Sequence, residues 1–116
     1  MLSLEDTKTS LLSYGRKEKQ HADEARQQAT QARSMARSYA ASFPPDDQTR
    51  KARVLGDAEM QAKRYEAAAA LHDRRSKVAL AGRLLWDSTT KSDPEIALKY
   101  QNLAAAAQQH GLIDFA

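Results

Sequence analysis

The chain has 116 residues, with 18 Lys and Arg against 15 Asp and Glu, a formal net charge of +3, and no cysteine. This length favours one small domain, and the lack of cysteine excludes disulfides, thiolate zinc sites and a thiol nucleophile. Alanine contributes 22 residues and aromatic residues only 6%, which is typical of helices. No apolar run reaches the roughly 18 residues of a membrane span, and the first residues lack the pattern of a signal peptide. We therefore expect a cytoplasmic protein.

The first predicted helix covers about residues 4–43. Apolar residues recur at alternating spacings of three and four from Ala22 to Phe43, which is the heptad pattern of a helix that packs along one stripe. Gly15 costs about 1 kcal/mol of helix propensity, so we expect a weaker helix before it. Pro44-Pro45 ends this helix, because a proline disfavours the α conformation of the preceding residue.

The second predicted helix covers about residues 47–88 and follows an aspartate that can cap it, Asp46 or Asp47. A stripe of mostly small residues from Leu55 to Ala79 repeats the spacing of three and four. Small side chains let two helix axes approach closely, and a short connection favours antiparallel neighbours. The two stripes are therefore predicted to pack against each other as an antiparallel hairpin.

The third predicted helix covers residues 93–110. Pro94 suits the first helical position, with Ser92 or Asp93 as the cap. Gly111 suits the left-handed residue that follows a helix end. We expect this helix to cover the larger apolar residues at the end of the second one.

The last residues, 112–116, include three sizeable hydrophobes after the terminating glycine. We expect this tail to fold back onto the helices, with a docking role as the alternative. The predicted fold is all-α: an antiparallel hairpin of two long alanine-rich helices plus a shorter third helix, a three-helix bundle. It forms a single helical domain over residues 1–116 and contains no β structure.

Histidines are the scarce residues for a metal site in this sequence. Glu18 and His21 have the Glu-x-x-His spacing of helical di-iron proteins, but such a site needs a second copy of the motif. His72 and His110 each follow an alanine at that spacing, so chance placement is the favoured interpretation and no metal is predicted. His72 is expected to be a partly buried packing residue, with a pH-sensitive role as the alternative.

The remaining polar residues form no recognisable catalytic pattern. The serines cluster at caps and loops without a strand-turn-helix context, and the four glycines stand alone and not in a phosphate-binding loop. We therefore predict that the chain is not an enzyme and uses no cofactor.

A partner-binding surface is predicted where the end of the second helix meets the third. The second helix carries more large hydrophobes there than one short helix covers. The predicted set comprises Leu84, Trp86, Tyr100 and Leu103 as apolar anchors and Arg75 and Arg83 as cations on the rim. The alternative is that these residues form the core of the junction with the third helix.

One segment resembles a known family. The residues that carry the resemblance are Ala58, Ala62, Lys63, Arg64, Tyr65, Glu66, Ala68, Leu71, His72, Leu80, Leu84 and Ser88. They are similar to a microtubule-interacting-and-transport (MIT) domain, a three-helix bundle with Tyr-Glu-x-Ala at the start of its second helix. The spacing is most similar to the MIT domain of the autophagy phosphatidylinositol 3-kinase regulatory subunit. The resemblance implies helices near 47–62, 65–88 and 93–110, and a role in membrane trafficking or autophagy.

The leading functional hypothesis is a non-enzymatic interaction module or assembly subunit that binds a partner helix in a groove. One alternative is a small secretion-type chaperone or structural hairpin protein. Another is a basic nucleic-acid-binding module, which the interleaved acids disfavour, as with Glu59 ahead of Lys63. Alanine-rich stripes bury little apolar area, so a homodimer that adds burial is a further hypothesis.

Overall fold

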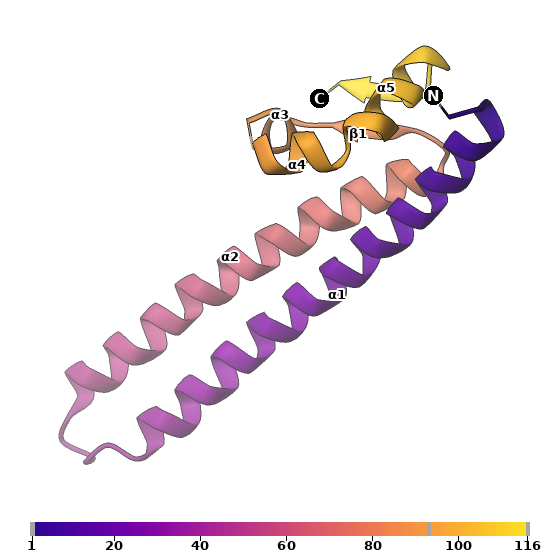
Figure 1. Cartoon of the computed structure of the whole chain (residues 1–116). Helices are drawn as coiled ribbons and strands as arrows, with labels where there is room; N and C mark the ends of the chain where they lie inside the picture. Colours follow the sequence, from indigo (N-terminus) through magenta and orange to yellow (C-terminus); the bar gives the residue numbers. More distant parts are fainter. Residues whose placement is uncertain (1, 93, 116) are drawn as a thin grey trace. The chain divides into compact units, whose positions relative to one another are not determined.

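The computed structural model describes residues 2–92 and 94–115, with the backbone alone at Lys91 and Glu95. Figure 1 shows its elements in chain order. They are α1 (Leu4–Ala41), α2 (Gln48–Leu80), β1 (Leu84–Trp86), α3 (Ser88–Ser92), α4 (Pro94–Lys99), α5 (Gln101–Gln109) and β2 (Ile113–Phe115). The all-α fold class is confirmed, with two long helices that pack against each other. In the described part of the chain, no helix is both long and apolar enough to cross a membrane.

The chain divides into two compact units. Unit 1 comprises Met1–Lys19 and Asp73–Ala116, and unit 2 comprises Gln20–His72. Each long helix contributes residues to both units. The largest fully buried side chains, Leu11, Leu84 and Thr7, lie in unit 1. The buried cluster of unit 2 consists of alanines, and Phe43 is also buried in that unit.

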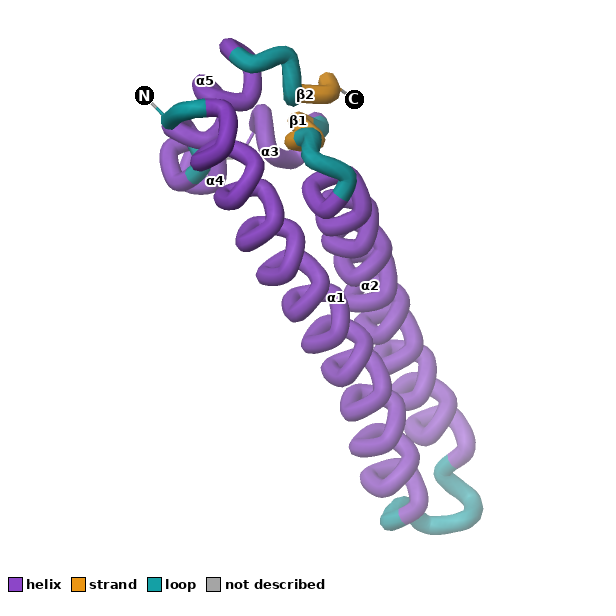
Figure 2. Tube along the Cα trace, turned by 90° about the vertical axis from the view of Figure 1, so that its right-hand side faces the viewer, coloured by secondary structure: helices purple, strands orange, loops and turns teal. Residues whose placement is uncertain are grey.

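In unit 2, the parts of α1 and α2 lie side by side and are joined by residues 42–47, drawn in teal in Figure 2. Ala22 and Ala25 of α1 form a buried cluster with Ala69 of α2, so the predicted small-residue stripes are the packed faces here. The carboxylate of Asp47 accepts a hydrogen bond from the Arg50 amide at 3.4 Å, and Asp47 therefore caps α2 as predicted.

A network of ion pairs crosses the same helix pair. Arg33 of α1 donates from Nε and Nη2 to both carboxylate oxygens of Glu59 on α2, at 2.9 and 2.8 Å. Its Nη2 also donates to Oε1 of Glu66 at 2.6 Å. The hydrogen bonds to these two carboxylates raise the pKa of Arg33, and the hydrogen bond from Arg33 lowers the pKa of Glu59. Two carboxylates about two turns apart on α2 thus hold one guanidinium of α1.

The second helix is shorter than predicted, because α2 ends at Leu80 and not near residue 88. Gly82 follows with a φ of +90°, a left-handed conformation that glycine adopts without a steric penalty. The next amide, of Arg83, donates back to the carbonyl of Val78 at 3.1 Å. This hydrogen bond belongs to the Schellman motif, which ends a helix and turns the chain. The residues after Gly82 are consequently released from α2.

The same motif ends α5, where the sequence predicted it. Gly111 has a φ of +71°, and the Leu112 amide donates to the carbonyl of Ala107 at 2.6 Å. The tail then folds back, as expected, and contributes β2 to unit 1.

The prediction of no β structure is wrong over two three-residue strands. β1 and β2 pair in parallel, with Leu84 opposite Ile113 and Trp86 opposite Phe115, and they lie side by side in Figure 2. The amide of Leu84 also donates to the carbonyl of Leu112 at 2.7 Å, next to the pair. These strands form because both Schellman turns leave a short apolar segment extended at the same end of unit 1.

The single helix predicted over 93–110 is instead two helices, α4 and α5. Tyr100 separates them, with φ −104° and ψ 11°, outside the helical geometry. Its ring packs edge to face on Tyr14 of α1, with centroids 4.8 Å apart, so the break accompanies a contact with the core. The predicted cap at Asp93 lies outside the described residues.

The core of unit 1 forms where α1, α2, β1 and α5 meet. Its buried members are Leu11, Tyr14, Ala79, Leu84 and Ala107. The sequence predicted a weaker helix before Gly15, but α1 is continuous through this residue. Gly15 lies where α1 contacts α2. The Ser76 hydroxyl donates to the Gly15 carbonyl at 2.7 Å, and a Cβ at Gly15 would lie only 3.0 Å from Leu80. The missing side chain therefore lets α1 and α2 approach closely in unit 1.

Candidate functional site

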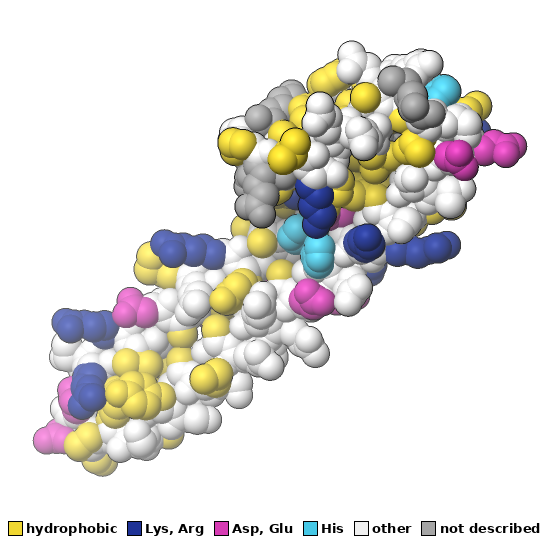
Figure 3. Space-filling view, viewed as in Figure 1, with side chains coloured by type: hydrophobic (Ala, Val, Ile, Leu, Met, Phe, Trp, Pro, Cys, Tyr) yellow, Lys and Arg dark blue, Asp and Glu magenta, His cyan; other side chains and the backbone are white. Residues whose placement is uncertain are grey.

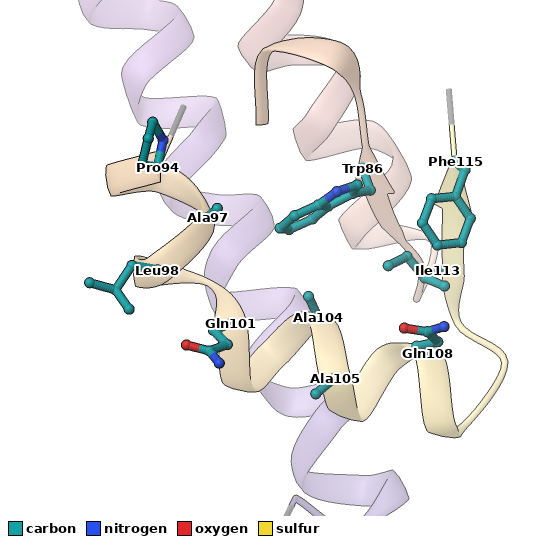
Figure 4. A pocket seen from close by; sticks show the side chains of 10 residues that line it. All are labelled: Trp86, Pro94, Ala97, Leu98, Gln101, Ala104, Ala105, Gln108, Ile113 and Phe115. Atoms are coloured by element: carbon teal, nitrogen blue, oxygen red, sulfur yellow. The ribbon is translucent and has the colours of Figure 1, made fainter. Parts of the chain in front are cut away.

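The candidate site is an apolar pocket of about 540 Å³ in unit 1, bounded by β1, β2, α4 and α5. Figure 4 shows the Trp86 indole extending from β1 toward α4, with Phe115 and Ile113 of β2 on the other side. The lining residues are Trp86, Pro94, Ala97, Leu98, Gln101, Ala104, Ala105, Gln108, Ile113 and Phe115. Two amides, of Gln101 and Gln108, are the polar side chains among them. The pocket is therefore suited to an apolar group that meets a few hydrogen-bonding groups.

Small residues on the helices and large ones on the strands create this hollow. Alanines 97, 104 and 105 reach only a short way from α4 and α5, whereas the parallel pairing places Trp86 beside Phe115. Two large hydrophobes at the pocket remain open to solvent, Leu98 at 73% and Phe115 at 62% exposure. An apolar ligand that covered them would gain about 25 cal/mol for each Å² removed from water.

Leu84, a predicted anchor, belongs to the core. Its side chain is 1% exposed and packs with Leu11 and Ala107. For Leu84 the structure therefore matches the alternative interpretation, in which it forms the junction with the third helical segment. The reason is the early end of α2, which places Leu84 in a strand that β2 covers.

Arg75, predicted as a cation on the rim, is buried. Its guanidinium donates from Nε to Asp87 Oδ2 at 2.9 Å and from Nη2 to Asp87 Oδ1 at 3.1 Å. Nη2 also donates to the Thr90 hydroxyl at 3.1 Å. Burial opposes the charge of Arg75, but the bonds to Asp87 outweigh it and raise the pKa of Arg75. The predicted rim position is wrong for Arg75, because its guanidinium is buried and an internal carboxylate accepts from its Nε and Nη2.

Asp87 joins this ion pair to the start of α3. Its Oδ1 accepts hydrogen bonds from the Thr90 amide at 2.9 Å and from the Thr90 hydroxyl at 3.1 Å, which makes it the N-cap of α3. Burial opposes ionisation of Asp87, but the hydrogen bonds from Arg75 and Thr90 outweigh it and lower the pKa of Asp87 to about 2. The pair thus fixes the segment between β1 and α4, which together bound the pocket.

Arg83 remains at the surface, as predicted for a rim cation. It precedes β1 and donates from Nε to Asp114 Oδ1 at 2.7 Å. This hydrogen bond raises the pKa of Arg83. Because Asp114 lies in β2, the pair links the two strands across their exposed side.

Tyr100 and Leu103 lie in a different place from Trp86. Both are half-buried against the core, and they line a smaller hollow of about 230 Å³. Tyr14 lines this hollow too, and burial raises the pKa of its hydroxyl. Of the four predicted anchors, Trp86 lines the large pocket, Tyr100 and Leu103 line the small hollow, and Leu84 lies in the core.

Three large apolar residues that line the pocket, Leu98, Ile113 and Phe115, were not among the predicted anchors. Leu98 lies outside the stripe of apolar residues that recur at spacings of three and four in the third segment, which comprises Ile96, Tyr100, Leu103 and Ala107. Ile113 and Phe115 alternate around Asp114, which is a strand signal, but three residues are too few to distinguish it from an irregular tail.

Comparison of the chain with protein-family models, curated proteins and solved structures found no match. The resemblance to an MIT domain therefore stays a prediction. α2 is continuous from Gln48 to Leu80, through the point at which the resemblance implies a boundary between two helices.

Proposed function

We propose that this chain is a non-enzymatic interaction module that binds a partner helix through the pocket at Trp86. The observation that supports the proposal is the exposure of Leu98 and Phe115 beside the half-buried indole, around one hollow of about 540 Å³. A continuous apolar patch of this kind, rimmed by polar groups, marks interaction sites on proteins. In unit 1, Leu98 and Phe115 expose 73% and 62% of their surface to solvent.

The lining favours a helix with apolar residues on one face. Such a helix presents side chains at spacings of three and four, which fit a row of apolar positions along a groove. Trp86 supplies the large rigid wall, and the amides of Gln101 and Gln108 supply hydrogen bonds at the edge. We assign the apolar anchors to Trp86, Leu98 and Phe115, and keep Arg83 as the cation near the rim.

We also propose how the helices are arranged. α1 and α2 act as an antiparallel hairpin, and α4 with α5 act as the third helical segment of a bundle. The pairing of Ala22 with Ala69 and of Arg33 with Glu59 supports the opposite direction of the two long helices within unit 2. A role in membrane trafficking or autophagy rests on the resemblance to MIT domains alone.

The test compares two charge substitutions at equally exposed apolar residues. Leu98→Glu places a carboxylate at the pocket, and Met35→Glu places one on α1 of unit 2, where the methionine is 71% exposed. The tagged chain is used to isolate a partner by chemical cross-linking, and the affinity of that partner is then measured by calorimetry. We expect Leu98→Glu to weaken binding at least tenfold and Met35→Glu to leave it within a factor of two.

Equal affinity of both variants would contradict the proposed site. The dependence of affinity on salt distinguishes the proposed function from the nucleic-acid alternative. Binding that neutralises several phosphates loses affinity steeply between 50 and 200 mM salt. Binding at an apolar pocket changes much less over this range. A steep loss with salt, together with capture of nucleic acid, would reject the proposed function as a whole.

A further inference from the structure

Two of the three histidines meet across the long helices of unit 2. His21 of α1 and His72 of α2 have ring centroids 5.3 Å apart and an angle of 65° between the ring planes. A nitrogen of one ring lies within 4.8 Å of a nitrogen of the other. His21 is exposed and His72 is half-buried, and Figure 3 shows adjoining histidine side chains in cyan on the surface of the long helices. An ion in solution can therefore reach both rings.

We propose that His21 and His72 form a bis-imidazole site for a divalent transition-metal ion, with zinc as the probe. Zinc binds imidazole nitrogen at about 2.0–2.1 Å in tetrahedral geometry, which places two ligand nitrogens about 3.4 Å apart. The two nitrogens already lie within 4.8 Å of each other, and rotation of the exposed His21 side chain adjusts their separation to this value. Water completes the coordination, as expected for a site at the surface.

The donor set determines the class of metal. Imidazole nitrogen suits zinc, copper and nickel, whereas magnesium and calcium require oxygen ligands in larger number. The sequence contains no cysteine, so no thiolate competes for a soft or borderline ion. His110 lies in unit 1, where its Nε2 is 3.2 Å from the Leu2 carbonyl oxygen. It therefore belongs to a separate environment and serves as a matched control.

A metal held by both rings joins α1 to α2. An ion that binds the folded chain and not the unfolded chain stabilises the folded state in proportion to the logarithm of its free concentration. The packed residues nearest to the pair in sequence are alanines, Ala22 and Ala69, which bury little apolar area. A bridging metal thus acts on a part of the chain where side-chain packing contributes little.

The experiment follows thermal unfolding and calorimetry of the full chain while zinc is added after treatment with a chelator. We expect a rise in the unfolding temperature with zinc, a stoichiometry of one ion per chain, and no rise with magnesium. His21→Gln and His72→Gln should each weaken zinc binding at least tenfold, and His110→Gln should leave it within a factor of two.

A second measurement uses only the wild-type chain, so its result does not depend on whether the histidine variants fold. Cobalt(II), a paramagnetic substitute for zinc, is added below stoichiometry to the wild-type chain, and the ring protons of the histidines are followed by NMR. We expect selective broadening of the His21 and His72 signals. Equal broadening of His110, no zinc-dependent rise, or full affinity in His21→Gln would each overturn the proposal.

Discussion

At the scale of single residues, the Arg75–Asp87 pair is the polar interaction in the described structure with the largest expected cost of removal. Both side chains are buried, at 5% and 7% exposure, and both Asp87 oxygens accept from the guanidinium. Removal of one partner leaves the other charge buried without compensation, which typically costs about 3–5 kcal/mol. Asp87 also caps α3, so its loss releases a helix start as well.

We therefore expect Asp87→Asn to lower the free energy of unfolding by about 3 kcal/mol or more in urea titrations. Asp114→Asn is the matched control, because it removes the same charge from an exposed pair with Arg83. Exposed pairs contribute about 0–1 kcal/mol, so the control should lose less than about 1 kcal/mol. Equal losses in the two variants would show that burial of the Arg75 pair has no special effect.

The same carboxylate predicts a dependence of stability on pH. The pKa of Asp87 is about 2 in the folded chain, against about 3.9 for an unfolded aspartate. Because the folded pKa is the lower one, the unfolded chain binds the proton more readily, and this contribution is present in full above about pH 4. It is lost as the pH falls from 4 toward 2 and below, and in full it amounts to about 2–3 kcal/mol.

Urea titrations at several pH values between 6 and 2 measure this effect. We expect the stability gap between the wild-type chain and Asp87→Asn to narrow as the pH falls below 4, since protonation removes the charge that the variant already lacks. Other carboxylates change the stability of both proteins together and cancel in the comparison. A gap that stays constant down to pH 2 would contradict the low pKa of Asp87.

At the scale of elements, the contact of α1 with α2 in unit 1 depends on a glycine. A Cβ at Gly15 would lie 3.0 Å from the Leu80 side chain and 3.2 Å from Ala79 Cβ, whereas a Cβ at Gly56 of α2 would meet no atom within 4 Å. Both glycines lie inside helices, and each lowers helix propensity by about 1 kcal/mol relative to alanine. The two positions thus differ in packing and not in propensity.

We expect Gly56→Leu to raise the free energy of unfolding by about 0.5–1 kcal/mol through helix propensity alone. Gly15→Leu should lower it by about 1–3 kcal/mol, because a larger side chain forces the packed helices apart. Thermal or urea unfolding of both variants provides the comparison. A stabilised Gly15→Leu chain would mean that the close approach at this position contributes nothing.

At the scale of the whole molecule, the two units differ in what they bury. Unit 1 encloses Leu11, Tyr14 and Leu84, whereas the buried cluster of unit 2 contains only alanines. Burial of a leucine or aromatic side chain contributes about 1.5–3 kcal/mol, and an alanine side chain contributes much less. Local stability follows such differences, and regions with few buried apolar contacts open more often.

Hydrogen exchange should reveal this difference within one helix. We expect the amide of Ala69, in unit 2, to exchange at least tenfold faster than that of Ala79, in unit 1, although both lie in α2 and are almost fully buried. The measurement is native-state exchange followed by NMR, corrected for intrinsic rates. Equal protection at the two positions would indicate that the chain opens as one cooperative unit.

The sequence by itself determined the features that depend on local interactions. Pro44-Pro45 and the spacing of three and four predicted two long helices with packed small-residue stripes, and Gly111 predicted the end of α5. The end of α2 had an equally local signal in Gly82, whose Schellman motif matches that of Gly111, and the large hydrophobes after it obscured this signal. Of the candidate site, Trp86 was predicted, because a large aromatic near a helix end is conspicuous in any context.

Features whose partners are distant in the sequence depended instead on how the chain packs. β2, the strand that covers Leu84, comes from the tail. Asp87, whose carboxylate pairs with the buried Arg75, follows the turn at which the chain leaves α2. His72 lacks a glutamate three residues before it, so the Glu-x-x-His spacing gave no sign that His21 meets His72 across two helices. Spacing along one element fixes which residues share a face, but which faces meet depends on where each helix ends and how the chain turns.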